Sequence, residues 1–558
     1  MTRQEKPAKL IEQIRQSVIG EGRLFPTPFG LKPLIYADYT ASGRSLTFIE
    51  DYIRDSVMPF YANTHSEASA TGRQTTAFRE QARGLIRQSV GAGEDDAVIF
   101  CGSGATSAIQ KMVEILNIRI PAGLEDKYHL SAHMAENDRP VIFIGPYEHH
   151  SNELAWRESI ADVVTIPLDK DGAIDQMSLR AELETYADRH TKIGSFSAAS
   201  NVTGLLSDVA AITRILHEKG ALAFWDYAAA GPYVDIDVRG HNLDGLYLSP
   251  HKFIGGPGTP GVLVIRRHLL LNRVPSIPGG GTVSYVSPED HRYNPPGEHR
   301  EEGGTPAIIE SIRAGLVFQL KDAVGADVIE HREQVMTERA ISRWSRNPAI
   351  KILGNPSARR LSILSFLIMR QGKPLHFGFV DALINDLFGI QLRGGCSCAG
   401  PYGHELLNID MAHSRAIAEA VEDGHLVLKP GWVRLNFNYF IDQETFDYIL
   451  GAVELIAEYG WKLLGSYIYD PDRAIWSCRT GQIPAIRSLN GISFDGGKFQ
   501  PPENSQHGKR RPLRDYLDQT GKFLREAEAD LTDPLPPLPE KYASLRWFTL
   551  PGDAPSVA

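Results

Sequence analysis

Between about residues 90 and 270, short apolar runs alternate with amphipathic segments, and this alternation limits the possible folds more than any other feature. Apolar residues from Ile109 to Leu116 recur at the spacing of one helix face. A second helix is expected between Asp208, a good N-cap, and Gly220, a good C-cap. Strands that alternate with helices predict an α/β fold, with a mostly parallel sheet covered on both faces. The seven expected strands are Ala97–Phe100, Val141–Ile144, Val163–Pro167, Lys192–Phe196, Ala221–Trp225, Leu246–Leu248 and Val262–Ile265.

After about residue 310 the alternation loosens, which predicts a division into domains. Residues 36–310 are expected to form a large domain and residues 311–465 a smaller α+β domain. Residues 1–35 are expected to form an N-terminal arm that ends in PTPFGLKP. Residues 466–558 contain PPEN and DPLPPLPEK, so we expect a proline-rich C-terminal extension that is extended and at most partly ordered.

Composition argues against several classes of function. The formal net charge is −10 without a long basic stripe, so nucleic acid is not expected as a partner. The segment MTRQEKPAKLIEQIRQ lacks the apolar core of a signal peptide, and no apolar run is long enough to span a membrane. The chain of 558 residues has too few cysteines for a disulfide framework: Cys101, Cys396, Cys398 and Cys478. We therefore expect a soluble, cytoplasmic protein with reduced thiols.

One lysine stands in an unusual context. In LYLSPHKFIGGPGTPGVLVI, residues 246–265, Lys252 lies between two apolar runs, just before a glycine-rich segment. A lysine near buried strands is costly unless it is paired, neutral or covalently used. A bridge to a surface acid is the ordinary alternative. However, Ser249 and His251 beside it are suited to phosphate oxygens, and lysine amines in such places form Schiff bases with aldehydes.

Two further segments fit the same interpretation. Asp226 ends an apolar strand in FWDYAAAGP, where a carboxylate is suited to hold a protonated pyridine nitrogen; a turn or an N-cap is the alternative. GSGATSAIQKMVEIL, residues 102–116, places a glycine-rich turn before a helix, which alone is a weak signal for phosphate binding. A pyridoxal 5′-phosphate site is predicted by the order of four residues along the chain: Asp226, Ser249, His251 and Lys252.

Polar residues also follow other expected strands. His149 and His150 come directly after a strand in GPYEHHSNELAW. An imidazole there is suited to stack on a flat ring and to move protons, and surface polarity is the alternative. Asn201 in SAASNVTG is placed to bind the phenolic oxygen of the cofactor.

The C-terminal half supplies thiols and cations. QLRGGCSCAGP places Cys396 and Cys398 on a glycine-rich loop behind Arg393. No second ligand pair at the usual spacing accompanies them, so no metal site is predicted. An exposed thiol near a cation is typical of a nucleophile, and a pair of small loop residues is the alternative. Arg434 in GWVRLNFNYF is suited to clamp a substrate carboxylate.

With these motifs the chain resembles the class V aminotransferase family and, within it, the cysteine desulfurases and selenocysteine lyases. The resemblance covers about residues 30–465 and rests on motifs in the family's order: YADYTASGR, NTHSEAS, GSGATSA, EHHSN, SNVTG, SPHK, EEGGTPA and RGGCSC. It implies a pyridoxal-phosphate-dependent transferase of fold type I, with a large and a small domain, that forms a homodimer.

The resemblance also implies roles for individual residues. Lys252 resembles the Schiff-base lysine, Asp226 the partner of the pyridine nitrogen, and His149 the residue that stacks on the ring and carries protons. Cys398 resembles the persulfide-forming cysteine, beside which Cys396 is either a sulfur relay or a bystander. The other matches bind the phosphate (Ala105, Thr106, Ser249, His251 and, in the neighbouring subunit, Thr305), the phenolic oxygen (Asn201) or the substrate (Arg434, Arg393 and Asn201).

The implied activity removes sulfur from L-cysteine, or selenium from selenocysteine, to give alanine, with a persulfide on Cys398 and an acceptor protein for the sulfur. Ala229 stands where the family usually carries Gln, and an amphipathic insert, Met411 to Leu428, precedes Arg434. These departures resemble the desulfurase half of molybdenum-cofactor sulfurases. A class V enzyme that forms no persulfide (an aminotransferase, an epimerase or a C–S lyase on another amino acid) stays open, as does a non-catalytic scaffold.

Overall fold

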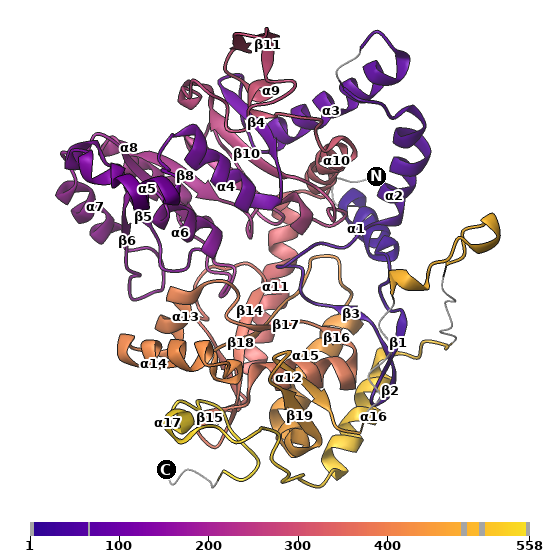
Figure 1. The fold of residues 1–558 in the computed structure, drawn as a ribbon. Helices are drawn as coiled ribbons and strands as arrows, with labels where there is room; N and C mark the ends of the chain where they lie inside the picture. Colours follow the sequence, from indigo (N-terminus) through magenta and orange to yellow (C-terminus); the bar gives the residue numbers. More distant parts are fainter. Residues whose placement is uncertain (1–4, 65–66, 481–487, 502–507, 554–558) are drawn as a thin grey trace.

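The computed structural model describes residues 5–64, 67–480, 488–501 and 508–553, and its largest sheet has seven strands (Figure 1). They lie in the order β4-β10-β9-β8-β7-β5-β6. β10 is antiparallel to both of its neighbours, and the other pairs are parallel. The mostly parallel sheet and its strands are therefore confirmed: β4 Asp96–Cys101, β5 Val141–Ile144, β6 Asp162–Thr165, β7 Lys192–Ser197, β8 Leu222–Asp226, β9 Gly245–Leu248 and β10 Gly261–Arg266.

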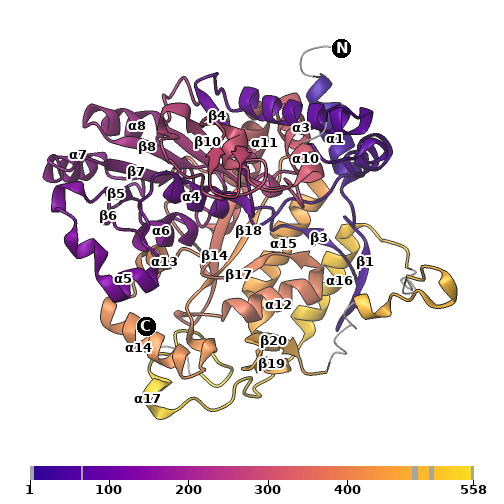
Figure 2. The ribbon, with the colours of Figure 1, turned by 45° about the horizontal axis from the view of Figure 1, so that its top comes forward.

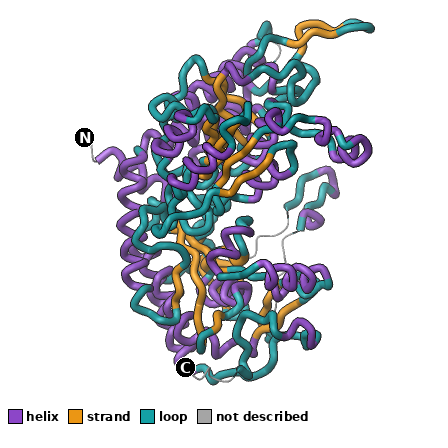
Figure 3. The backbone as a smooth tube through the Cα atoms, turned by 90° about the vertical axis from the view of Figure 1, so that its left-hand side faces the viewer, coloured by secondary structure: helices purple, strands orange, loops and turns teal. Residues whose placement is uncertain are grey.

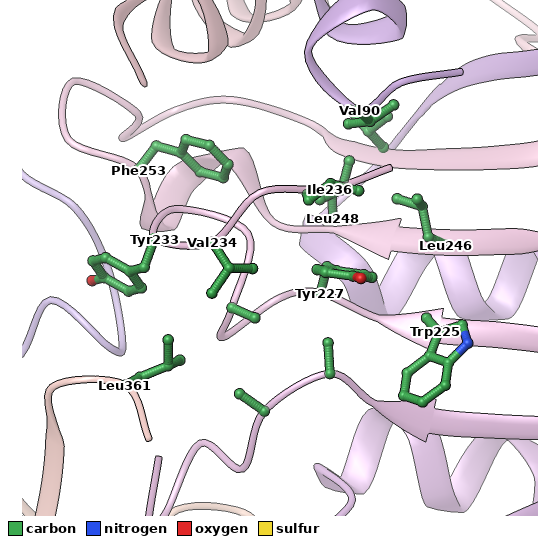
Figure 4. Packing of buried hydrophobic residues seen from close by; sticks show 14 of the residues in the cluster. Val90, Trp225, Tyr227, Tyr233, Val234, Ile236, Leu246, Leu248, Phe253 and Leu361 are labelled. Carbon is green, nitrogen blue, oxygen red and sulfur yellow. The ribbon is translucent and has the colours of Figure 1, made fainter. Parts of the chain in front are cut away.

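Apolar cores cover both faces of this sheet, because successive side chains of a strand point to opposite sides. Ile99 and Tyr247 belong to the core that includes α4 (Gly104–Ile115) and α6 (His150–Arg157). Trp225 and Leu246 belong to the opposite core, part of which Figure 4 shows. The helices of that second core include α3 (Ala70–Ser89), α7 (Gln176–Thr185), α8 (Val209–Glu218) and α10 (Ile308–Val324).

A second, smaller sheet lies below the first in Figures 1 and 3. Its strands follow the order β13-β14-β18-β17, with β15 on β14, and its pairs are antiparallel. Phe366 of β14 and Phe379 of α12 lie in its core. This α+β part consists mainly of α11 Ala326–Trp344, β13 Ile350–Ile352, β14 Ile363–Arg370, β15 Lys373–Pro374, α12 Phe377–Phe388, β17 Arg393–Gly395, β18 Trp432–Asn436 and α15 Gln443–Tyr459.

The N-terminal segment contacts both parts. α1 (Glu5–Ser17) buries Ile11 and Ile14 in the core that includes α10. β3 (Ile35–Tyr36) pairs in parallel with β16 (Ile390–Gln391). This pairing brings Asp38, two residues after the end of β3, to Arg434 of β18.

The C-terminal extension differs from the loosely ordered appendage expected from its prolines. β19 (Tyr467–Asp470) pairs with β20 (Ile475–Cys478), and α16 (Leu513–Glu526) packs on α15 and α12 (Figure 2). Leu513, Tyr516 and Leu524 recur at helical spacing and are buried in the smaller core. That spacing is present in the sequence and favours a helix, whereas the proline-rich segments on either side favour an extended chain. Most of the PPEN motif, like His65 and Ser66 of NTHSEAS, lies outside the described residues.

In the described part of the chain, no helix has both the length and the apolar character needed to cross a bilayer.

The remaining helices and strands are mostly short. These elements include β1 Leu24–Thr27, β2 Gly30–Pro33, α2 Thr47–Tyr52, α5 Ala122–Tyr128, β11 Val283–Val286, β12 His291–Tyr293, α9 Glu298–Glu301, α13 Gly400–Leu407, α14 Met411–Glu422 and α17 Glu540–Ala543.

Candidate active site

A cavity lies between the two sheets, at the carboxyl ends of strands of the large sheet. The first turn of α4, the loops after β7, β8 and β9, and residues of β17 and β18 form its wall. Ligands of open α/β sheets bind at this edge. The cavity is lined by every predicted site residue except Thr305: Ala105, Thr106, His149, Asn201, Asp226, Ser249, His251, Lys252, Arg393, Cys398 and Arg434.

Asp226 and Lys252 bring opposite charges into the cavity. Asp226 ends β8, is 4% exposed and accepts a hydrogen bond from Ala228 N at 2.8 Å. Burial raises the pKa of Asp226, and the charge of Lys252 opposes this rise. Burial likewise lowers the pKa of Lys252 to about 8, with Asp226 acting in the opposite direction. The Lys252 amine is therefore neutral in a larger fraction of molecules near pH 8 than an ordinary lysine.

The start of α4 and the segment after β9 form a cradle. Gly104 has φ +58°, and a Cβ there would lie 2.7 Å from His251 Cε1 and 3.0 Å from Ser249 Oγ. Only glycine therefore lets these two side chains approach the first N–H groups of α4. Ala105 N donates to Ser249 Oγ at 2.9 Å, and Thr106 Oγ1 lies 2.7 Å from Ser151 Oγ. The helix N–H groups, hydroxyls and imidazole of this cradle suit a phosphate.

His149 is held as a neutral ring. It caps α6, where its Nδ1 accepts from Ser151 N at 3.2 Å, so the ring proton lies on Nε2. Burial and then the charge of Lys252 lower the pKa of His149 to about 3. The preceding Glu148 is buried and accepts hydrogen bonds from Ser197 N at 3.0 Å and Ser197 Oγ at 2.6 Å. These bonds fix the His149 loop against β7.

Arg434 and Arg393 place two cations in the cavity wall. Arg434 is 2% exposed; its Nη2 donates to Asp38 Oδ1 at 2.9 Å and its Nη1 to Asn201 O at 3.0 Å. Burial lowers the pKa of Arg434, and Asp38 opposes this effect. Arg393 lies directly opposite Arg434 in the pairing of β17 with β18, so both side chains share one face of the sheet. Two adjacent guanidinium groups suit a carboxylate ligand.

Cys398 lies in the loop between β17 and α13. Its side chain is exposed and lines the cavity. Ser397 and Cys398 have φ +54° and +56°, a conformation uncommon for residues other than glycine. Cys396 is half-buried, packs against the large core and is absent from the described lining of the cavity. The two cysteines of the CxC motif therefore have different environments.

Several residues that line or support the cavity were missed from the sequence. Thr40 lines it, and its buried Oγ1 has no hydrogen-bond partner among the described residues. Asp38 is the partner of Arg434. Both belong to the YADYTASGR motif, which supports the family resemblance but does not by itself predict a role for Asp38 or Thr40. Ser151 and Ser197 were also missed, because a serine beside a strand or helix end is ordinary in any α/β chain.

Residues 35–444, most of the chain, match the family model described as aminotransferase class-V. The chain belongs to this family. A curated relative from Streptomyces coelicolor, named probable cysteine desulfurase, is 28% identical over 66% of this chain and 84% of its own length. A relative of the same name from Halalkalibacterium halodurans is 29% identical over 66% of this chain and 85% of its own length.

Solved structures of two cysteine desulfurases share the fold. The cysteine desulfurase of Thermococcus onnurineus superposes with a TM-score of 0.61 at 22% identity, covering 76% of this chain and 95% of that one. A cysteine desulfurase of Escherichia coli gives a TM-score of 0.60 at 19% identity, covering 81% and 98%. These structures support fold type I for the present chain.

Members of the class V aminotransferase family depend on pyridoxal 5′-phosphate, and the cavity fits that group. The cradle at Gly104 is a place that a Cβ would fill. The buried carboxylate of Asp226 suits a protonated ring nitrogen. The Oγ1 atom of Thr40 is a buried polar atom without a partner in the described part of the chain. Among the described residues, no three His, Cys, Asp or Glu side chains are grouped to hold a metal ion.

Two positions, Thr305 and Ala229, differ from the other motif positions of the family. Thr305 lies outside the cavity and lines a separate pocket with Phe100 and Gly102. Its Oγ1 accepts a hydrogen bond from Asn63 Nδ2 at 3.4 Å. Ala229 lines the cavity at the position where family members usually carry Gln, so a methyl group stands there instead of an amide.

Proposed function

We propose that this chain is a pyridoxal-phosphate-dependent cysteine desulfurase, which converts L-cysteine to alanine and leaves the sulfur as a persulfide on Cys398. One observation carries the proposal: Lys252 and the exposed Cys398 line the same cavity. A lysine that is suited to bind the cofactor would allow the enzyme to act on an amino acid. A thiol in the same cavity would allow it to take over the sulfur of that amino acid. The names of the curated relatives support the same activity.

The cofactor would be held by the residues described above. When bound, it supplies an aldehyde carbon that captures amines and a ring that stores an electron pair. The Gly104 cradle would bind its phosphate, Lys252 Nζ its aldehyde carbon and Asp226 its ring nitrogen. His149 would stack on the ring. Asn201 donates one amide N–H to Ser397 O at 2.8 Å, which leaves the other for the phenolic oxygen.

Substrate recognition and proton transfer follow from the charged groups. Arg434 and Arg393 would bind the carboxylate of L-cysteine and hold its α-carbon near Lys252. Lys252 Nζ, once released, would take the α-proton, for which a pKa of about 8 is favourable near neutral pH. His149 is neutral near pH 7 with its ring proton on Nε2, so the ring would stack on the cofactor and donate a hydrogen bond from Nε2, and its pKa of about 3 makes it a weak proton acceptor.

The sulfur step uses the Cys398 thiolate as the nucleophile. Its Sγ attacks the sulfur of the bound cysteine, so an S–S bond forms while the C–S bond of the substrate breaks. The electron pair of that bond stays with the carbon fragment, which leaves as alanine after protonation. A second thiol, on an acceptor protein or a reductant, would then remove the terminal sulfur from Cys398.

The remaining features of the proposal concern the whole protein. We assign residues 36–310 to the large domain and residues 311–465 to the small one, with the cavity in the space between them; α10, which crosses this boundary, packs in the core of the large sheet. Thr305 lies outside the cavity of its own chain, which supports a homodimer in which it serves the neighbouring site. The cysteines of the described chain are free, in keeping with a cytoplasmic location.

The test follows L-cysteine turnover by the purified holoenzyme, with alanine and sulfide measured in the presence of a reductant. We expect both products in equal amounts, and we expect Cys398→Ala to keep the cofactor colour and lose both products. Cys478→Ala is the matched control, because Cys478 lies on β20 and not in the cavity wall. Wild-type protein without alanine formation, or a fully active Cys398→Ala variant, would contradict the proposal and favour a class V enzyme without a persulfide.

A further inference from the structure

The loop that carries Cys398 needs support from outside itself. Ser397 and Cys398 both have positive φ without being glycine, a conformation that destabilises a loop unless its surroundings hold it. Such a loop persists only where surrounding contacts hold it. The contacts that hold it therefore decide where the Cys398 thiol points.

His150 contacts the loop on both sides of Ala399. Its backbone N–H donates to Cys398 O at 2.8 Å, and its Nε2 accepts a hydrogen bond from Gly400 N at 3.0 Å. A Cβ on residue 400 would lie only 3.3 Å from the same Nε2, so the ring and the loop are in close contact. One histidine thus binds a carbonyl before Ala399 and an N–H after it.

The starts of two helices explain why these bonds form. His150 is the first residue of α6, and Gly400 is the first residue of α13. The first N–H groups of a helix have no partner inside the helix. Here the free N–H of α6 is satisfied by the loop, and the free N–H of α13 is satisfied by the His150 ring. Each contact therefore satisfies one N–H group that its helix would otherwise leave without a partner.

Other contacts separate His150 from the groups that do the chemistry. Its neighbour His149 lines the cavity, whereas His150 does not. Asn201 Nδ2 donates to Ser397 O at 2.8 Å and so holds the carbonyl on the other side of Cys398. Nε2 of His150 accepts the hydrogen bond from Gly400 N, so the N–H of this ring lies on Nδ1.

We propose that His150 is a positioning residue that holds the Cys398 loop against α6, so that the thiol faces the substrate sulfur. This inference rests on the proposed function for its effect on turnover, but the contact itself does not depend on that function. Loss of the ring removes one of the two bonds from His150 and leaves the backbone bond to Cys398 O. The loop then loosens without the site losing its cofactor ligands.

The experiment compares wild type, His150→Ala and His150→Gln by hydrogen exchange in peptides that cover residues 396–402. Because this hydrogen bond is lost, His150→Ala should speed exchange at the Gly400 amide about five- to tenfold, with no change in distant peptides. His150→Gln, whose Oε1 is able to accept from the same N–H, should restore most of the protection. His190→Ala is the control, because that side chain is 71% exposed.

Turnover gives the second readout. For His150→Ala we expect kcat for alanine formation to fall about tenfold, KM for L-cysteine to stay within about twofold, and the cofactor spectrum to be unchanged. Unchanged exchange in residues 396–402 of His150→Ala would overturn the positioning role, even if the wild type failed to use cysteine. If His150→Ala does not fold, Gly400→Ala replaces it, because its methyl group would press on Nε2, and faster exchange is again expected.

Discussion

At the scale of single residues, the cavity is built at the expense of stability. Lys252 is placed among buried groups that lower its pKa, and Arg434 is buried with Asp38 as its carboxylate partner. Burial of charged groups destabilises the folded state unless a ligand or a partner compensates. We therefore expect a charged ligand in the cavity to compensate the cost of burying these groups.

The Lys252 ammonium gives a pH-dependent test of this cost. Its folded pKa of about 8 lies below the ordinary 10.5, so the folded chain binds this proton less tightly than the unfolded chain. The penalty is complete below pH 8, declines as pH rises from 8 to 10.5, and vanishes above 10.5. In the cofactor-free protein, Lys252→Met should therefore raise the free energy of unfolding by roughly 3 kcal/mol at pH 7.

The measurement is urea unfolding of both proteins at pH 7 and pH 10 after removal of the cofactor. The difference between Lys252→Met and wild type should shrink at the higher pH. Lys429→Met, a substitution in the loop before β18, serves as the control for the loss of a positive charge. A variant less stable than wild type at pH 7, or a difference that does not change with pH, would contradict the assigned cost.

At the scale of elements, the C-terminal extension closes one end of α12. His376 caps this helix, and its ring is surrounded by aromatic residues from α12 and the extension. The Trp547 ring stacks on it at 5.5 Å, and the Phe548 ring meets it edge-on at 4.9 Å. Asp381 of the same helix accepts a hydrogen bond from Gly394 N at 3.1 Å, in the strand that leads to Cys398. The extension thus supports the element that anchors the thiol loop.

Phe548→Ala tests whether the extension is part of the folded core. Phe548 is 0% exposed, so its truncation should lower the free energy of unfolding by about 3–4 kcal/mol. Phe499→Ala is the matched control: Phe499 belongs to the same extension but is 61% exposed, so a change below about 0.5 kcal/mol is expected. Denaturant unfolding measures both, and equal small effects would mean that the extension is not part of the core.

The elements differ in how well the sequence predicts them. The strands of the large sheet are short and rich in apolar residues, and most are separated by helices, so each is predicted from the sequence within a few residues. α16 carries its apolar residues at helical spacing, but it is flanked by segments whose composition suggested little order. Asp38 could not be paired with Arg434 from the sequence, because their contact depends on β3 joining β16 across the molecule. Local pattern predicts elements, whereas long-range pairing decides which residues meet.

At the scale of the whole molecule, residues from both sheets line the cavity, whereas Thr305 does not. That residue lies in a separate pocket with Phe100 and Gly102, outside the cavity of its own chain. A motif threonine that its own cavity does not use fits a site completed by a second copy of the chain. This arrangement predicts that a dimer, and not the single chain, is the active unit.

Mixed dimers test this prediction by complementation. Lys252→Ala inactivates the site of its own chain, and Thr305→Ala should weaken cofactor binding at the site of the partner chain. In a dimer that contains one variant of each kind, one site has an intact Lys252 and receives an intact Thr305 from the other chain. We therefore expect mixing, after dissociation and reassociation at limiting cofactor, to restore activity above that of either variant alone. If Thr305 serves the site of its own chain, every site in the mixture carries one defect and no activity is regained. Mixing Lys252→Ala with Cys398→Ala is the control, because both substitutions affect a chain's own cavity and leave no intact site.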